Sequence, residues 1–152
     1  MWLDALLSWL HFSAMFLVFG FLTVEVMLER EPIDARVAVL LARSDAWYVG
    51  SAIATLAAGI ARLVLGAKGM AFYTGNPVFW LKVGLFVAVL LVSVLPTRQF
   101  MRWRAQFAVD SRHAVGDGER RRIRRLVMIE LHLLAVVPLA AVLMARGIGS
   151  RG

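Results

Sequence analysis

Residues 98–125, RQFMRWRAQFAVDSRHAVGDGERRRIRR, form the longest hydrophilic stretch of the chain. This stretch holds nine arginines and three acidic residues, Asp110, Asp117 and Glu119. An apolar run long enough to cross a bilayer precedes it, and another follows. Because loops retained on the cytoplasmic side of a membrane carry an excess of Lys and Arg, the sequence predicts a basic cytoplasmic loop at 98–125. This loop orients the rest of the chain.

The composition indicates a membrane protein with a single domain. The chain has 152 residues, of which 61% are hydrophobic, and its mean hydropathy is +0.75. Its net charge of +7 is concentrated between apolar runs, which favours contact with anionic lipid headgroups over nucleic acid. The absence of cysteine excludes disulfides and thiolate catalysis. The first apolar run has no basic start and no small-residue cleavage site, so we interpret it as a retained span.

Four apolar runs have the length of about 20 residues that a helix needs to cross a bilayer. The predicted spans are residues 3–28, 46–67, 78–96 and 126–145, which together make one transmembrane domain 1–152. Residues 33–42 are expected to form an interfacial helix, and Pro96 is expected to end or kink the third span. Lys68 is the only basic residue between spans two and three. The prediction is therefore an all-α, up-and-down four-helix bundle in the bacterial inner membrane, with both termini outside.

Polar residues within the spans fall on single helix faces at 100° per residue. The face of the first span holds Asp4, Ser8, His11, Met15, Val18, Leu22, Glu25 and Glu29. The second span aligns Tyr48, Ser51, Thr55, Ala58 and Arg62, and the third aligns Lys82, Phe86, Val89 and Ser93. Ionisable groups at membrane depth are costly and usually face the bundle interior, which makes them candidates for function.

Depth separates these candidates into two groups. The outer half holds His11, Arg62 and Lys82, and the inner half holds Glu25, Asp45, Glu130 and His132. Glu130 and His132 lie roughly 160° apart on their helix, so only one of them faces the axis. Structural roles compete with functional ones. Arg62 and Lys82 could extend to the outer interface, Glu25 and Glu130 could pair with arginines of 98–125, and either histidine could be a hydrogen-bonded core residue.

The first functional hypothesis is binding of haem b. Neutral imidazole is a common ligand of haem iron, and His11 is placed in a bundle core. Arg62 and Lys82 lie at a similar depth and could pair with propionates, while Met15 or Lys82 could offer a sixth ligand. His132 lies roughly 13 Å deeper than His11, so it would belong to a separate site.

Two resemblances accompany this hypothesis. His11, the later Gly20 and the Trp80-Leu81-Lys82 start of the third span resemble the small haem-dependent protoporphyrinogen oxidases of bacterial membranes. That resemblance implies functional roles for His11 and Lys82, although Val24-Glu25 stands where the oxidases carry a Pro-Arg pair. The whole chain also resembles an uncharacterised family of small bacterial four-helix membrane proteins, which implies the fold and no activity.

Two other classes of function stay open. A non-catalytic scaffold or accessory subunit, as a homodimer or with a membrane partner, would need only small-residue helix faces and the basic loop. A small transporter or proton path could use Glu25, His132 and the stripe from Tyr48 to Arg62. The sequence shows no broken-helix pair or inverted repeat of the kind that builds transporter sites.

Overall fold

The fold is a bundle of four long helices, described by a computed structural model over residues 2–66 and 69–146. The elements are α1 (Trp2–Leu28), α2 (Ala35–Leu65), the short α3 (Gly69–Thr74), α4 (Pro77–Val109) and α5 (Asp117–Ala145). The residues described contain no strand. All four long helices are long and apolar enough to cross a membrane. The predicted all-α membrane bundle is confirmed.

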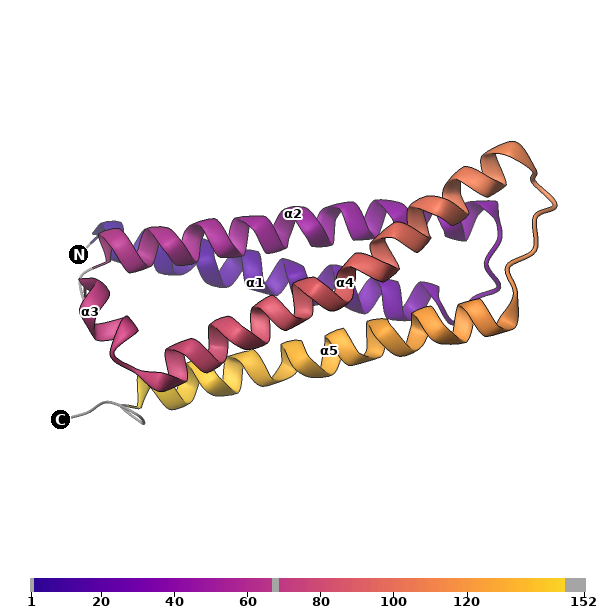
Figure 1. Ribbon diagram of the computed structural model, residues 1–152. Coiled ribbons are helices and arrows are strands. Elements are labelled where there is room, and N and C mark those ends of the chain that lie inside the picture. Colours follow the sequence, from indigo (N-terminus) through magenta and orange to yellow (C-terminus); the bar gives the residue numbers. More distant parts are fainter. Residues whose placement is uncertain (1, 67–68, 147–152) are drawn as a thin grey trace.

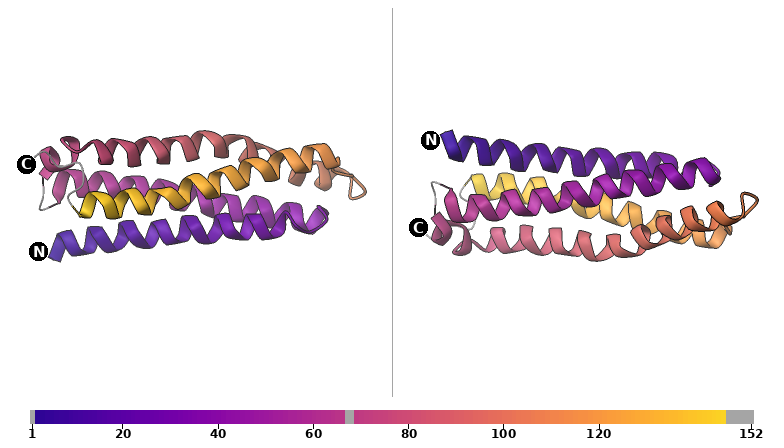
Figure 2. Two further views of the ribbon diagram at one scale, coloured as in Figure 1. Left: turned by 90° about the horizontal axis from the view of Figure 1, so that it is seen from below. Right: turned by 90° about the horizontal axis from the view of Figure 1, so that it is seen from above.

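The four long helices run alternately up and down (Figure 1). The start of α1, the helix α3 and the end of α5 lie at one end, called here the terminal end. The connections α1–α2 and α4–α5 lie at the other, the arginine end. Figure 2 shows the bundle as an elongated rod. Helix α1 packs mainly on α2, and α4 mainly on α5, so two hairpins meet through α2–α4 and α1–α5.

Helix α2 begins earlier than the sequence predicts. The Asp34 carboxylate accepts a hydrogen bond from the Val37 N–H at 2.7 Å, and such a cap satisfies one free donor of a first turn. The interfacial helix expected at 33–42 and the span expected at 46–67 therefore merge into one helix over 35–65, while residue 67 lies outside the described residues. Helix α4 is capped in the same way, since Asn76 accepts from the Val78 N–H at 2.8 Å and Pro77 fills the first position.

The arginine-rich stretch 98–125 is mostly helical, although the sequence predicts a loop there. Helix α4 continues through Pro96 to Val109, and α5 begins at Asp117, which leaves 110–116 as the connection. A proline removes one backbone hydrogen bond and bends a helix without always ending it. The residues that follow, including Arg, Gln and Met, are strong helix formers. The apolar runs predicted at 78–96 and 126–145 are therefore shorter than the helices that contain them.

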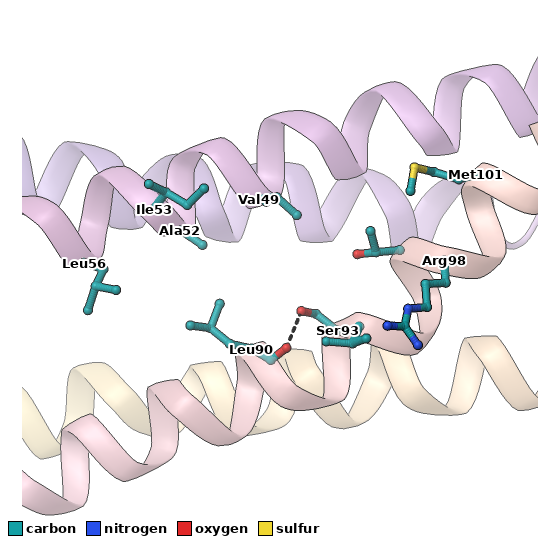
Figure 3. Close-up of a pocket in the computed structure, with 10 residues that line it drawn as sticks. Val49, Ala52, Ile53, Leu56, Leu90, Ser93, Arg98 and Met101 are labelled. Carbon is teal, nitrogen blue, oxygen red and sulfur yellow. Dashed lines mark hydrogen bonds between the residues drawn. The ribbon is translucent and has the colours of Figure 1, made fainter.

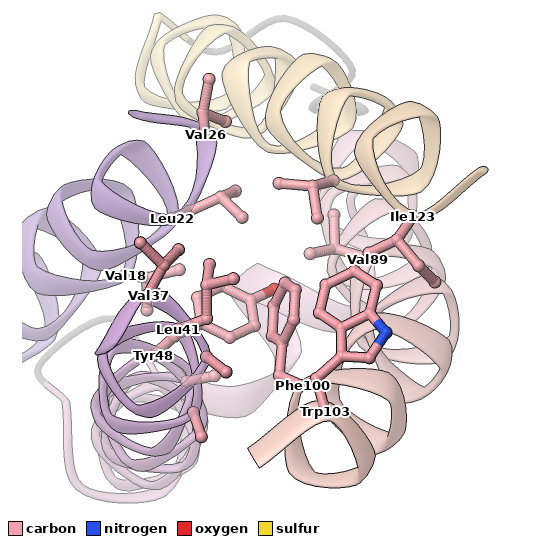
Figure 4. Close-up of a cluster of buried hydrophobic side chains, with 14 of the residues drawn as sticks. Val18, Leu22, Val26, Val37, Leu41, Tyr48, Val89, Phe100, Trp103 and Ile123 are labelled. Carbon is pink, nitrogen blue, oxygen red and sulfur yellow. The ribbon is translucent and has the colours of Figure 1, made fainter. Parts of the chain in front are cut away.

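A continuous apolar core joins all four long helices (Figure 4). Val18 and Leu22 of α1 face Leu41 of α2, while Phe100 and Trp103 of α4 fill the arginine end. Four tryptophans are exposed at the bundle surface, as an interfacial aromatic belt requires: Trp2, Trp9, Trp47 and Trp80. Trp103 differs from these four because it is fully buried.

The side of the membrane that each end faces is open to a direct test. The chain has no cysteine, so one can be introduced at the exposed Ser111 of the arginine end or the exposed Thr74 of the terminal end. We expect a membrane-impermeant maleimide to label Thr74→Cys, and not Ser111→Cys, in intact bacterial spheroplasts. Lysis should make both label. Labelling of Ser111→Cys alone in intact spheroplasts would show that the orientation is the opposite of the predicted one.

Candidate functional sites

Three basic side chains from three helices lie together in the half of the bundle nearest the terminal end. They are His11 of α1, Arg62 of α2 and Lys82 of α4, named here the cationic site. Lys82 and Arg62 both act electrostatically on the His11 imidazole, and Arg62 acts on Lys82. The structure thus brings together the three residues that the sequence places at one depth.

The His11 imidazole is held in one orientation by α2. Its Nδ1 lies 2.9 Å from the backbone carbonyl oxygen of Thr55. Because a carbonyl oxygen only accepts, Nδ1 carries the proton and the Nε2 lone pair is left for another partner. Gly59 allows this contact, since a Cβ at that position would lie 3.2 Å from His11 Cε1. Sequence reasoning missed Gly59, whose signal was the run of small residues on α2.

Aromatic rings lie beside Arg62 and Lys82 of the cationic site. The Arg62 guanidinium carbon lies 5.6 Å from the centre of the Phe12 ring, and Lys82 Nζ lies 5.6 Å from the centre of the Phe79 ring. A ring face attracts a cation at such distances. Arg62 Nε is buried and has no hydrogen-bond partner among the described residues. Two like charges beside one imidazole favour the approach of an anionic group.

The sequence also predicts His132 and Met15 as candidate ligands, and the structure places them differently. His132 is exposed on α5, where its Nδ1 lies 2.6 Å from the Met128 carbonyl oxygen. Its neighbour Glu130 is buried, so Glu130 is the one that faces the axis. Met15 is half-buried one turn beyond His11 on α1.

A second polar group occupies the core nearer the arginine end. Glu25 of α1, Asp45 of α2 and Glu130 of α5 are buried there and act electrostatically on one another; they are named here the carboxyl cluster. The Tyr48 hydroxyl donates to Glu130 Oε2 at 3.2 Å, and the Thr97 hydroxyl donates to Asp45 Oδ1 at 2.8 Å. The partner of Glu130 is therefore a tyrosine, where the sequence suggested an arginine of 98–125.

Arg120 joins α5 to the end of α1. Its Nη2 donates to the backbone carbonyls of Glu29 at 3.0 Å and Arg30 at 2.9 Å, which satisfies carbonyls that a helix end leaves free. The Glu29 side chain is buried beneath this contact. Burial raises the pKa of the Glu29 carboxyl to about 8, although Arg124 and Arg120 act in the opposite direction.

Two surface grooves of about 400 Å³ each flank the bundle. The first lies between α2 and α4 and is largely apolar, with Ser93, Thr97 and Arg98 among its lining residues (Figure 3). The second lies between α4 and α5 at the arginine end, where Arg102 and Arg122 line it. Neither groove is lined by His11.

Fold and polar core together define a small multi-pass helical membrane protein with ionisable groups from several helices in its interior. The chain belongs to the family described as "Predicted membrane protein (DUF2214)", whose model matches residues 3–149. This match confirms the predicted membership of a family of four-helix membrane proteins. No curated protein and no solved structure matches the chain.

Proposed function

We propose that this membrane protein binds haem b at the cationic site, where His11 would be a ligand of the iron, and that it has a redox role. The observation that carries the proposal is the oriented imidazole of His11 beside Arg62 and Lys82. A neutral imidazole with a free nitrogen suits haem iron, and two cations suit the two propionates of the porphyrin. Helix bundles commonly hold haem in this way.

The residues of the site have separate tasks in this proposal. The Thr55 carbonyl fixes the tautomer of His11 and raises the basicity of the ligating nitrogen. Arg62 and Lys82 would hold the carboxylates of the porphyrin by charge. Haem, when bound, supplies one-electron exchange. Met15, or Lys82 if its amine were neutral and not paired with a carboxylate, would be the candidate for a second ligand, whereas His132 is exposed on the surface of the bundle.

The resemblance to the haem-dependent protoporphyrinogen oxidases adds a substrate class to this proposal. It rests on His11 and Lys82, both of which lie in the cationic site. A porphyrinogen carries ring carboxylates like those of haem, so the same cations would attract it. The enzyme activity that we propose is oxidation of such a substrate, with its electrons passing to a separate electron acceptor of the membrane.

The arginine end is proposed to contact anionic headgroups on the cytoplasmic face of a bacterial inner membrane. Eight of the nine arginines in 98–125 are exposed: Arg98, Arg102, Arg104, Arg112, Arg121, Arg122, Arg124 and Arg125. Each basic side chain near an anionic surface contributes about 1 kcal/mol of attraction.

The haem proposal is tested by a reduced-minus-oxidised visible spectrum of protein purified in detergent from cells supplied with haem. We expect the wild type to show a Soret band and a sharp α-band, and His11→Ala to lose most of the bound haem. His132→Ala, at the exposed histidine of α5, is the matched control and should keep its spectrum. Arg62→Gln should retain less haem than wild type because one propionate loses its partner.

Two results would overturn the haem proposal. The first is a folded but colourless wild type prepared with haem available. The second is an unchanged spectrum in His11→Ala. A colourless protein would leave the scaffold and transport hypotheses. Replacement of the buried carboxyls should affect transport, whereas a scaffold should tolerate it.

A further inference from the structure

The carboxyl cluster is a feature that the haem proposal does not use. Glu25, Asp45 and Glu130 come from three helices and are 1%, 4% and 1% exposed. Carboxylates are expensive to bury at membrane depth and are found there mainly with a partner or a function. Because these carboxyls come from α1, α2 and α5 to one buried region, the question is how their negative charge is compensated.

Hydrogen bonds within the protein leave part of this cluster unsatisfied. Glu25 Oε1 and Glu130 Oε1 are buried and have no hydrogen-bond partner in the described part of the chain. Both side chains are more than nine-tenths buried and lie within electrostatic range of the other carboxyls. The polar or charged groups near the cluster are Glu29, just after the end of α1, Tyr48 from α2, and Ser93 and Thr97 from α4. Arg120 and Arg124 from α5 act on Glu29.

These neighbours do not neutralise three carboxylates. Tyr48 and Thr97 are neutral donors and provide one hydrogen bond each. Arg120 directs its guanidinium to the carbonyls of Glu29 and Arg30. Like-charged carboxyls that share a buried site cannot all be ionised, so the group retains protons that would be lost in water.

The geometry points to a proton-binding site formed by Glu25, Asp45 and Glu130, in which the buried carboxyls share protons and exchange them with water at the arginine end. A proton is favoured over a metal ion as the bound species. Within the described residues, no three His, Cys, Asp or Glu side chains are grouped so as to hold a metal ion. A proton needs only one oxygen, and Glu25 and Glu130 each offer a free one.

Glu29 supplies the connection to the arginine end. It directly follows the last residue of α1, where its N–H donates to the Glu25 carbonyl at 2.9 Å, and it is within electrostatic range of Glu25 and Glu130. In uptake, a proton passes from the buried Glu29 carboxyl to a carboxylate of the cluster, and a second proton from the arginine end then replaces it on Glu29. The net change is the loss of one negative charge from the core. This inference does not depend on haem.

The site is tested by infrared difference spectroscopy of the full-length protein reconstituted in lipid. We expect the wild type to show the C=O stretching band of protonated carboxyls at neutral pH, with the shift that deuteration causes. Glu25→Gln and Glu130→Gln should each remove part of that band, because Gln keeps the shape of the side chain but binds no proton. Tyr48→Phe should shift the contribution of Glu130 to the band, since it removes the hydrogen bond to Glu130.

Glu31→Gln is the matched control, because Glu31 is exposed near the same end of α1. It should leave the band unchanged. The inference is overturned if wild type shows no protonated carboxyl at neutral pH, or if the band survives intact in both Glu25→Gln and Glu130→Gln. It is also overturned if sodium ions at constant pH abolish the band, which would identify the cluster as a cation site.

Discussion

Replacement of Trp103 by alanine is expected to lower the free energy of unfolding by about 3–5 kcal/mol. Trp103 is fully buried and packs on Phe100, with ring centres 5.8 Å apart. It lies beyond the predicted span 78–96, in the part of α4 that extends toward the arginine end. Its burial there removes a large apolar surface from water, and alanine would leave a cavity. Thermal unfolding in detergent, followed by circular dichroism, measures the loss.

Two further variants separate packing from other effects. Trp9 is 63% exposed, so Trp9→Ala should change stability by no more than about 0.5 kcal/mol. Trp103→Phe should cost much less than Trp103→Ala, because a phenyl ring fills part of the space of the indole and the Nε1, which has no hydrogen-bond partner among the described residues, is removed. Equal losses in Trp103→Ala and Trp9→Ala would contradict the buried position of Trp103.

Sequence reasoning predicted the architecture because its signals are strong and additive. Four runs of about 20 apolar residues leave little choice but four helices, since a bilayer tolerates no unsatisfied backbone. Helix ends were predicted poorly. Hydropathy falls at Pro96, but the helix continues to Val109. The residues after Pro96 are good helix formers, and helical hydrogen bonds also form outside the apolar span. Hydropathy thus predicts the membrane-spanning part of a helix but not the residue at which the helix ends.

For the candidate sites, helical periodicity predicted which residues share a face. It placed Lys82, Val89 and Ser93 together on α4, where Val89 and Ser93 are buried and Lys82 is partly so. The same periodicity showed that Glu130 and His132 cannot both face the bundle axis. It could not choose between them, because the rotation of a helix in the bundle depends on its neighbours. The structure buries Glu130 and exposes His132.

Contacts between helices were outside the reach of sequence reasoning. The hydrogen bond from Tyr48 to Glu130 joins residues that are 82 positions apart. The clamp of Arg120 on the α1–α2 connection joins residues 90 or more positions apart. Both depend on side-chain directions across the bundle, which a one-dimensional periodicity does not determine.

Replacement of Glu29 by glutamine is expected to stabilise the protein at neutral and alkaline pH and to flatten the dependence of its stability on pH. Burial raises the pKa of Glu29 from 4.5 to about 8. Between these values the folded state binds more protons than the unfolded state, so the free energy of unfolding falls as pH rises. The stabilising effect is complete below about 4.5 and is lost as pH passes 8. The difference is on the order of a few kcal/mol, and glutamine abolishes it because it does not ionise.

Unfolding measured across this pH range in Glu29→Gln, Glu31→Gln and wild type distinguishes burial from the mere loss of a charge. Glu31 is exposed two positions further along the chain, and Glu31→Gln should follow the wild-type curve. The Arg120 contacts should survive in Glu29→Gln because they reach the backbone carbonyls of Glu29 and Arg30 rather than the carboxylate. A Glu29→Gln curve as steep as that of wild type would mean that Glu29 is ionised in the folded protein, held in that form by Arg124 and Arg120.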